Sequence, residues 1–280
     1  NHFAWFESYL LRGTPSSQRA FTSLIRNEFA VESYLEVGAW YYRAGLLKDA
    51  RSVLSLAPPN AEVLFWLAYL EAKLTGSFDK AMAAAVGASP SGVFPFRPES
   101  AEVFSWATSV TQNWKAKYFL GLIYWNRNQL TKARELFAAC GNQPDFAPMY
   151  AARAELVKQS AVQDLQKAAE LDTKQWRYGK MLIQHYLGEK KYSEALKVAQ
   201  DYDKRLANDF RIRLLLAKAY LLNENYVACN DVLMKTQVLP YEGSTEGHAL
   251  YREAWLMQAM AKIKAGKYTE ALTMISKARL

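Results

Sequence analysis

The sequence predicts an all-α fold, a right-handed α-α superhelix of about seven antiparallel helical hairpins. Three observations lead to this prediction. The 280 residues include only 13 Gly and 9 Pro, which favours long helices joined by short turns. Small residues recur at the positions where paired helices must cross closely, with large apolar residues between them. No stretch of any length shows the apolar–polar alternation of a β-strand.

The N-terminal part of the chain is divided by its glycines and prolines. Gly38 and Ala68 occupy the small position in two successive hairpins, and Pro58 ends the first of them because proline cannot continue a helix. We expect one continuous solenoid over 1–280, within a longer polypeptide because the chain begins with Asn1. Its expected parts are a cap or degenerate repeat at 1–31, two repeats at 33–86, a Gly/Pro-rich loop at 87–98, and the remaining repeats at 99–278.

The clearest repeat lies at 114–140. Its first helix carries Leu120, Gly121 and Tyr124, and its second carries Ala133 and Phe137. Farther along, Ala195 and Cys229 stand one period of 34 residues apart. The surrounding expected elements are a helix at 99–112 and hairpins at 146–171, 175–202, 209–235 and 250–278.

These residues resemble the tetratricopeptide repeat (TPR) superfamily, whose signature L-G-x2-Y…A-x3-F the 114–140 repeat matches without a gap. Three segments also look like a narrower bacterial family, in which an N-terminal β-rich domain of unknown function precedes a TPR array. They are Val93–Glu99, Asp145–Arg153 and Leu239–Ala254. The resemblance implies that this chain is the C-terminal array, in some members in a carbohydrate-related context, and it implies no catalytic residue.

The composition limits the classes of partner. A formal net charge of +8 is compatible with anionic partners, although an ordinary solvated surface is the simpler explanation. No apolar run is long enough to span a membrane, and no signal peptide is visible. Cys140 and Cys229 stand at small positions and are expected to be buried thiols. We expect a soluble bacterial protein, without a choice between cytoplasm and periplasm.

The sequence shows no constellation of catalytic residues. It lacks a nucleophile elbow, a phosphate-binding loop and a dinucleotide-binding glycine pattern. The three histidines, His2, His185 and His248, stand far apart and have no ligand-spaced neighbour. We therefore predict a protein that is not an enzyme, with no catalytic residue, no metal and no cofactor.

The repeat pattern also predicts a binding groove, because the first helix of each hairpin lines the inner face of a solenoid. Its expected exposed residues are Tyr42, Arg43, Lys115, Tyr118, Trp125, Asn126, Arg177, Lys180, Gln184, Arg211 and Lys218. The mixture of basic, aromatic and aliphatic side chains suits an acidic peptide, although ordinary solvated helix faces would look similar. It differs from the carboxylate clamp of chaperone-binding repeats, which requires Asn in place of Gln184 and a basic residue in place of Leu215.

Loops that interrupt the period are a second candidate surface, since such insertions often lie on the binding face. Their expected partner-binding residues are Phe94, Phe96, Arg97, Tyr241, Glu242 and His248. The alternative is that the aromatic ones only fill gaps between hairpins.

Three functions follow from these patterns. The leading hypothesis is a non-catalytic scaffold that binds a peptide segment, or the N-terminal domain implied by the resemblance. The alternative is an accessory array of a carbohydrate-active enzyme. Nucleic-acid binding is a weaker alternative, because the repeats lack paired polar positions at constant spacing.

Overall fold

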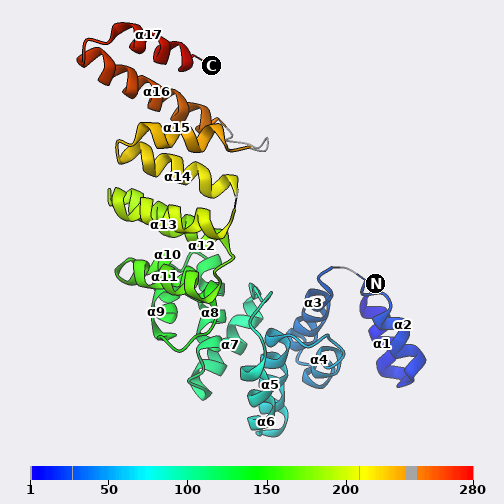
Figure 1. Ribbon diagram of the computed structural model, residues 1–280. Helices are drawn as coiled ribbons and strands as arrows, with labels where there is room; N and C mark the ends of the chain where they lie inside the picture. The colour runs from blue at the N-terminus through cyan, green and yellow to red at the C-terminus, as the bar shows by residue number, and fades with distance from the viewer. Residues whose placement is uncertain (1, 27, 208, 238–244, 280) are drawn as a thin grey trace. The chain divides into compact units, whose positions relative to one another are not determined.

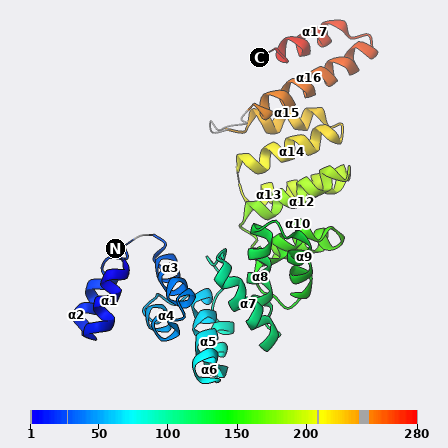
Figure 2. The same cartoon turned by 180° about the vertical axis from the view of Figure 1, so that it is seen from behind.

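The computed structural model describes residues 2–26, 28–207, 209–237 and 245–279, which contain α-helices, one short 3-10 helix and no β-strand (Figures 1 and 2). The predicted all-α, superhelical repeat fold is therefore confirmed. The chain forms two compact units, Asn1–Pro144 and Asp145–Leu280. Whether the whole chain is one continuous solenoid stays a prediction.

The first unit contains four helix pairs and one single helix within the described residues. The helices are α1 (His2–Arg12), α2 (Pro15–Thr22), α3 (Ala30–Arg43), α4 (Leu47–Leu54), α5 (Ala61–Thr75), α6 (Asp79–Gly87), α7 (Pro98–Val110), α8 (Trp114–Asn126) and α9 (Leu130–Ala139). The single helix, α7, packs against both α5 and α8. The predicted loop at 87–98 corresponds to the break between α6 and α7.

The second unit contains four further helix pairs among its described residues. They are α10 (Ala147–Leu156) with α11 (Ala161–Leu171), α12 (Trp176–Gly188) with α13 (Tyr192–Arg205), α14 (Phe210–Leu222) with α15 (Tyr226–Met234), and α16 (Glu246–Lys264) with α17 (Tyr268–Lys277). The short 3-10 helix η1 (Lys158–Ser160) joins α10 to α11. Consecutive pairs stack, since α11 packs on α12, α13 on α14, and α15 on α16.

Glycines allow close contact within three of these pairs. A Cβ added at Gly38 would lie 2.8 Å from Leu54 Cγ, and one added at Gly121 would lie 2.6 Å from a ring carbon of Phe137. In the α12–α13 pair the corresponding contact joins Gly179 to the ring of Tyr202, at 2.5 Å. Real Cβ contacts are longer than this, so the large side chain of one helix packs directly on the backbone of the other.

The cores are mainly apolar, with isolated buried polar pairs. Both predicted buried thiols, Cys140 and Cys229, are buried, and burial raises the pKa of Cys229 to about 12. In the second unit, Arg153 on α10 donates two hydrogen bonds to Asp164 on α11, at 2.9 and 2.6 Å, and both side chains are buried. This ion pair joins the two helices of the hairpin.

Candidate functional site

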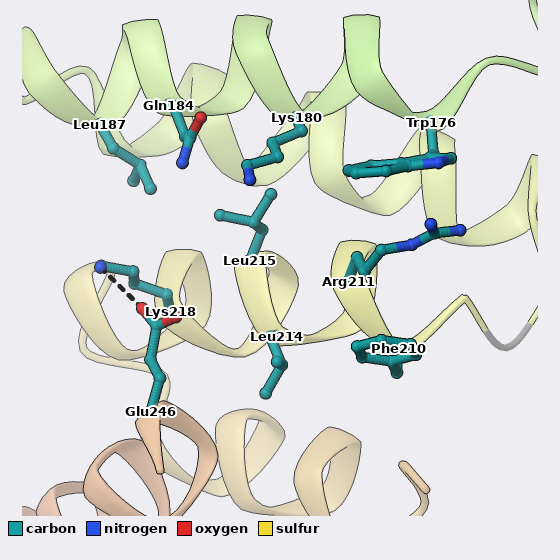
Figure 3. Close-up of a pocket in the computed structure, with 10 residues that line it drawn as sticks. All are labelled: Trp176, Lys180, Gln184, Leu187, Phe210, Arg211, Leu214, Leu215, Lys218 and Glu246. Carbon is teal, nitrogen blue, oxygen red and sulfur yellow. Dashed lines mark hydrogen bonds and ion pairs between the residues drawn. The ribbon is translucent and has the colours of Figure 1, made fainter. Parts of the chain in front are cut away.

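A groove of about 470 Å³ in the second unit brings together most of the basic residues predicted there. We call it the α12–α14 groove, and Figure 3 shows the side chains that line it. Those from α12 are Trp176, Lys180, Gln184 and Leu187; those from α14 are Phe210, Arg211, Leu214, Leu215 and Lys218; and α16 contributes Glu246. It is thus built from the first helices of three consecutive hairpins.

Trp176 forms one end of the groove, where positive charge is concentrated. The guanidinium carbon of Arg211 lies 3.8 Å from the centroid of the Trp176 ring. Arg177 and Lys180 approach the same ring at 4.9 and 5.8 Å. Cations at such distances are attracted by the electron density of the indole face. The indole therefore holds several cations together that would otherwise repel one another.

The orientation of Arg211 is set by Asp209, the residue that caps the N-terminus of α14. Asp209 accepts hydrogen bonds from the backbone N–H and from Nε of Arg211, both at 3.0 Å, and from Nη2 at 2.5 Å. These bonds hold the pKa of the Asp209 carboxyl below its ordinary value, and they raise the pKa of Arg211. Among the described residues, no hydrogen bond is made by Nη1.

The other end of the groove is closed by an ion pair between helices. Lys218 Nζ on α14 lies 2.9 Å from Glu246 Oε1, the first residue of α16 (Figure 3). The buried side chains of Leu214 and Leu215 lie between the two ends. Leu215 points toward Lys180 of α12, whereas Leu214 points toward α16 (Figure 3). Within the part of the chain that the structure describes, Lys180 has no carboxylate within ion-pair distance. It is therefore the basic group of the groove that is least neutralised by the protein itself.

Some of the binding residues predicted in the second unit therefore lie together in this groove. Lys180, Gln184, Arg211 and Lys218 line one groove, whereas Arg177 is exposed outside its lining, contacts the Trp176 ring and donates to Gln175 Oε1 at 3.3 Å. The prediction did not include Trp176, Phe210 and Glu246. A signal for two of them is present in the sequence, because Trp176 and Phe210 are aromatic residues one 34-residue period apart, each at the start of a helix.

A smaller pocket, of about 340 Å³, lies in the first unit. It joins loop residues and helix residues that the sequence placed in separate groups, and we call it the Phe94–Trp125 pocket. Its lining residues are Phe94, Pro95, Phe96, Leu122, Trp125 and Asn126. Phe94 is 70% exposed and Phe96 is 48% exposed, so neither ring is enclosed between hairpins.

The third predicted loop residue of this unit, Arg97, holds the loop in place. It forms an ion pair with Glu32 of α3, donates to the Glu32 carbonyl at 3.2 Å, and stacks on the ring of Phe96 at 4.6 Å. These contacts are within the protein and join the loop that carries Phe96 to α3.

Two predicted groove residues of the first unit need correction. Tyr118 is only 2% exposed and packs against Phe119 and Phe137, so it belongs to the core and is not on an accessible face. Lys115 donates to the carbonyls of Val86 and Ala88, both at 2.6 Å, at the C-terminus of α6. It caps a neighbouring helix. The sequence prediction placed both on the inner face because it considers the first helix of one hairpin at a time, whereas their accessibility depends on neighbouring helices.

The remaining predicted binding residues that the structure describes line neither the α12–α14 groove nor the Phe94–Trp125 pocket. The Tyr42 hydroxyl lies 2.9 Å from that of Tyr69, and exposed Arg43 pairs with Glu99 at 3.2 Å. His248 is exposed on α16, outside both pockets. Tyr241 and Glu242 lie outside the described residues.

The described residues contain no group of three or more His, Cys, Asp or Glu side chains that could hold a metal ion. None of the helices described here is long and apolar enough to span a membrane. The lining of the α12–α14 groove offers charged donors, a carboxamide and apolar side chains.

Comparison with known proteins supports the repeat assignment. Residues 97–145 match the tetratricopeptide repeat family. This stretch includes the 114–140 repeat, so the resemblance to the superfamily is confirmed, while the β-rich N-terminal domain stays a prediction. No curated protein sequence matches the chain.

Several solved structures are similar at low identity. A tetratricopeptide repeat protein from Parabacteroides merdae is 14% identical over 89% of this chain and 92% of its own, with a TM-score of 0.39. The C-terminal part of a TPR repeat-containing protein from Cytophaga hutchinsonii is 14% identical over 64% and 73%, with a TM-score of 0.47. YrrB, a TPR protein with an unusual peptide-binding site, is 16% identical over 64% and 91%, with a TM-score of 0.45. All three scores are below 0.5, so they add nothing about function.

Proposed function

We propose that this tetratricopeptide repeat protein is a non-catalytic interaction scaffold, and that its α12–α14 groove binds an acidic segment of a partner protein. The observation that supports this most directly is Lys180, a cation without an ion-pair partner among the described residues, on the wall of a groove with an apolar floor. A ligand carboxylate would supply the missing partner, and charge-assisted hydrogen bonds are the strong ones.

The groove also has the composition of a recognition site. Trp176 and Phe210 offer large apolar faces, and the mostly buried Leu214 and Leu215 add apolar side chains to the lining. Binding energy at protein interfaces is concentrated in aromatic and Arg anchors of this kind. Gln184 adds a carboxamide that can pair with a ligand backbone.

The carboxylate of Glu246 occupies a position that a ligand carboxylate could take beside Lys218. This carboxylate pairs with Lys218 at 2.9 Å and is the acidic group of the groove lining. An acidic ligand must compete with it for Lys218. Glu246→Gln is therefore expected to strengthen binding of acidic peptides, because the substitution removes both the competitor and a like charge.

The test is fluorescence anisotropy with a labelled peptide rich in Asp and Glu, at low and moderate salt. Lys180→Glu is expected to weaken binding about tenfold or more, in line with the loss of a charge-assisted contact and the addition of repulsion. Lys197→Glu is the matched control, because Lys197 is exposed on α13, outside the groove. Equal losses in the two variants would show only a general effect of net charge and would contradict the proposal, as would unchanged binding by Lys180→Glu.

A second candidate function is that of an accessory array in a carbohydrate-active protein. The Phe94–Trp125 pocket favours it, because exposed aromatic rings beside the carboxamide of Asn126 combine apolar faces with a few polar groups. The test is calorimetric titration of neutral oligosaccharides against the wild type and Phe94→Ser. Binding that the substitution abolishes would support this function, and the absence of heat with every oligosaccharide would count against it.

A further inference from the structure

The two cations of α14 that line the groove stand at a defined distance from each other. Arg211 and Lys218 are seven residues apart, so they share one face of the helix and are separated by about 10 Å along its axis. Figure 3 shows them at opposite ends of the groove, with Leu214 and Leu215 between them. Hydrogen bonds to Asp209 hold Arg211 in place, so the position of this cation is fixed.

Only some ligand conformations can present two carboxylates at that distance from one side. In a polyproline II segment, residues i and i+3 lie on the same face about 9 Å apart. In a β-strand, same-face residues lie about 7 Å apart at i+2 and about 13 Å apart at i+4. A helical ligand could match with i and i+7, but it is itself about 10 Å wide. A groove of about 470 Å³ instead suits a few extended residues.

We propose that the α12–α14 groove selects acidic segments in the polyproline II conformation, with two carboxylates three residues apart. This inference rests on the proposed function of the groove. One carboxylate pairs with Arg211, through Nη1, and the other pairs with Lys218 in place of Glu246. The two residues between them lie over the leucine floor, which favours Pro or an aliphatic residue.

The opposite wall fits such a ligand as well. A polyproline II backbone makes no internal hydrogen bonds, so its carbonyls need donors from the protein. Lys180 and Gln184 lie on α12, across the groove from Leu215 of α14 (Figure 3). The carboxamide of Gln184 can supply such a donor, and Lys180 can pair with a further carboxylate of the ligand, as in the proposed function.

The test uses labelled dodecapeptides of one composition that differ only in the spacing of two Glu residues. The pair stands at i and i+2, i and i+3 with Pro-Leu between, or i and i+4. The i,i+3 peptide is expected to bind the full chain roughly tenfold more tightly than the other two, which is the effect of one additional charge-assisted hydrogen bond. In Lys218→Gln the three affinities should become equal, because only one anchor remains. The matched control Lys197→Gln should keep the preference.

The possible outcomes separate the two proposals. Acidic peptides that bind with no spacing preference, or with a preference for i,i+2 or i,i+4, would overturn the inference and leave the proposed function intact. A preference that persists in Lys218→Gln would also overturn it. If none of the acidic peptides binds, the proposed function itself fails.

Discussion

Individual residues determine how closely the paired helices approach and how well the buried polar groups are satisfied. The α12–α13 pair shows both effects, because the Tyr202 ring packs on Gly179 and its hydroxyl is buried without a hydrogen-bond partner among the described residues. In the first unit, Glu62 is a buried polar group of another kind, a carboxyl that accepts a hydrogen bond from a serine hydroxyl. Each leads to a separate prediction.

Gly179→Ala is expected to destabilise the protein. The added Cβ would lie 2.5 Å from the buried ring of Tyr202, and overpacking of this kind costs about 1–3 kcal/mol, more than the gain of about 1 kcal/mol in helix propensity. The control is Gly188→Ala, where nothing lies within 4 Å of the added Cβ, and it should be neutral or stabilising. Urea denaturation followed by circular dichroism measures both. A Gly179→Ala variant as stable as Gly188→Ala would refute the close packing.

Tyr202→Phe is expected to leave stability unchanged or to increase it by about 1 kcal/mol, because a buried hydroxyl without a partner costs free energy. Its ring contacts with Gly179 would be kept. The same urea experiment measures the effect, and a clear loss of stability would mean that the hydroxyl has a partner such as bound water. Tyr178→Phe on α12 serves as a comparison with another buried tyrosine.

The stability of the first unit is expected to fall as pH rises towards neutrality. Glu62 accepts a hydrogen bond from Ser100 Oγ at 2.5 Å, and Ser100 accepts one from Trp66 Nε1 at 3.0 Å. Burial raises the pKa of Glu62 from 4.5 to about 7. The folded state therefore keeps a proton that the unfolded chain loses near pH 4.5. The stabilisation is complete below that pH, decreases as pH rises, and is lost above about pH 7.

The measurement is denaturant unfolding at pH 5 and pH 8. The raised pKa corresponds to a loss of up to about 3 kcal/mol over this interval. Glu62→Gln should remove most of the loss, while Glu135→Gln, at an exposed position on α9, should keep it. Identical pH dependence in Glu62→Gln and wild type would contradict the assignment.

At the scale of helices, end-capping connects one element to another. The Lys115 ammonium of α8 donates to two carbonyls at the end of α6, both at 2.6 Å, across the loop that carries the Phe94–Trp125 pocket. The loop is also held from its other side, where Arg97 pairs with Glu32 of α3. The loop that carries the exposed Phe94 and Phe96 is therefore anchored to other helices on both sides.

Lys115→Ala is expected to destabilise the protein by about 1 kcal/mol, because the last carbonyls of α6 lose a charged donor. Lys80→Ala, an exposed position on α6, is the control for loss of a lysine from this region. Thermal unfolding followed by circular dichroism compares the two variants. Equal melting temperatures would show that the two hydrogen bonds make no net contribution.

At the scale of the whole molecule, repeat arrays are stabilised by contacts between neighbours, so a local change has a local effect. The described chain forms two compact units, with Gly179 in Asp145–Leu280. Gly179→Ala is therefore expected to reduce hydrogen-exchange protection in α12–α15 while leaving α3–α6 unchanged. Hydrogen exchange measured by mass spectrometry reads both regions at once. A uniform loss of protection along the chain would contradict this expectation.

The sequence by itself determined the helices, their pairing and the loop between α6 and α7. These follow from local rules, since helical periodicity, prolines and small residues act within one hairpin. It also indicated a basic groove, and four predicted residues, Lys180, Gln184, Arg211 and Lys218, line one.

Only the tertiary structure decided which predicted positions are accessible and which acidic groups accompany them. Tyr118 and Lys180 occupy equivalent positions in their repeats, yet Tyr118 is buried and Lys180 lines a groove. The pairing of Lys218 with Glu246 joins groups 28 residues apart in the chain. Burial and ion pairing depend on side chains from neighbouring hairpins, and the repeat pattern of one hairpin does not contain that information.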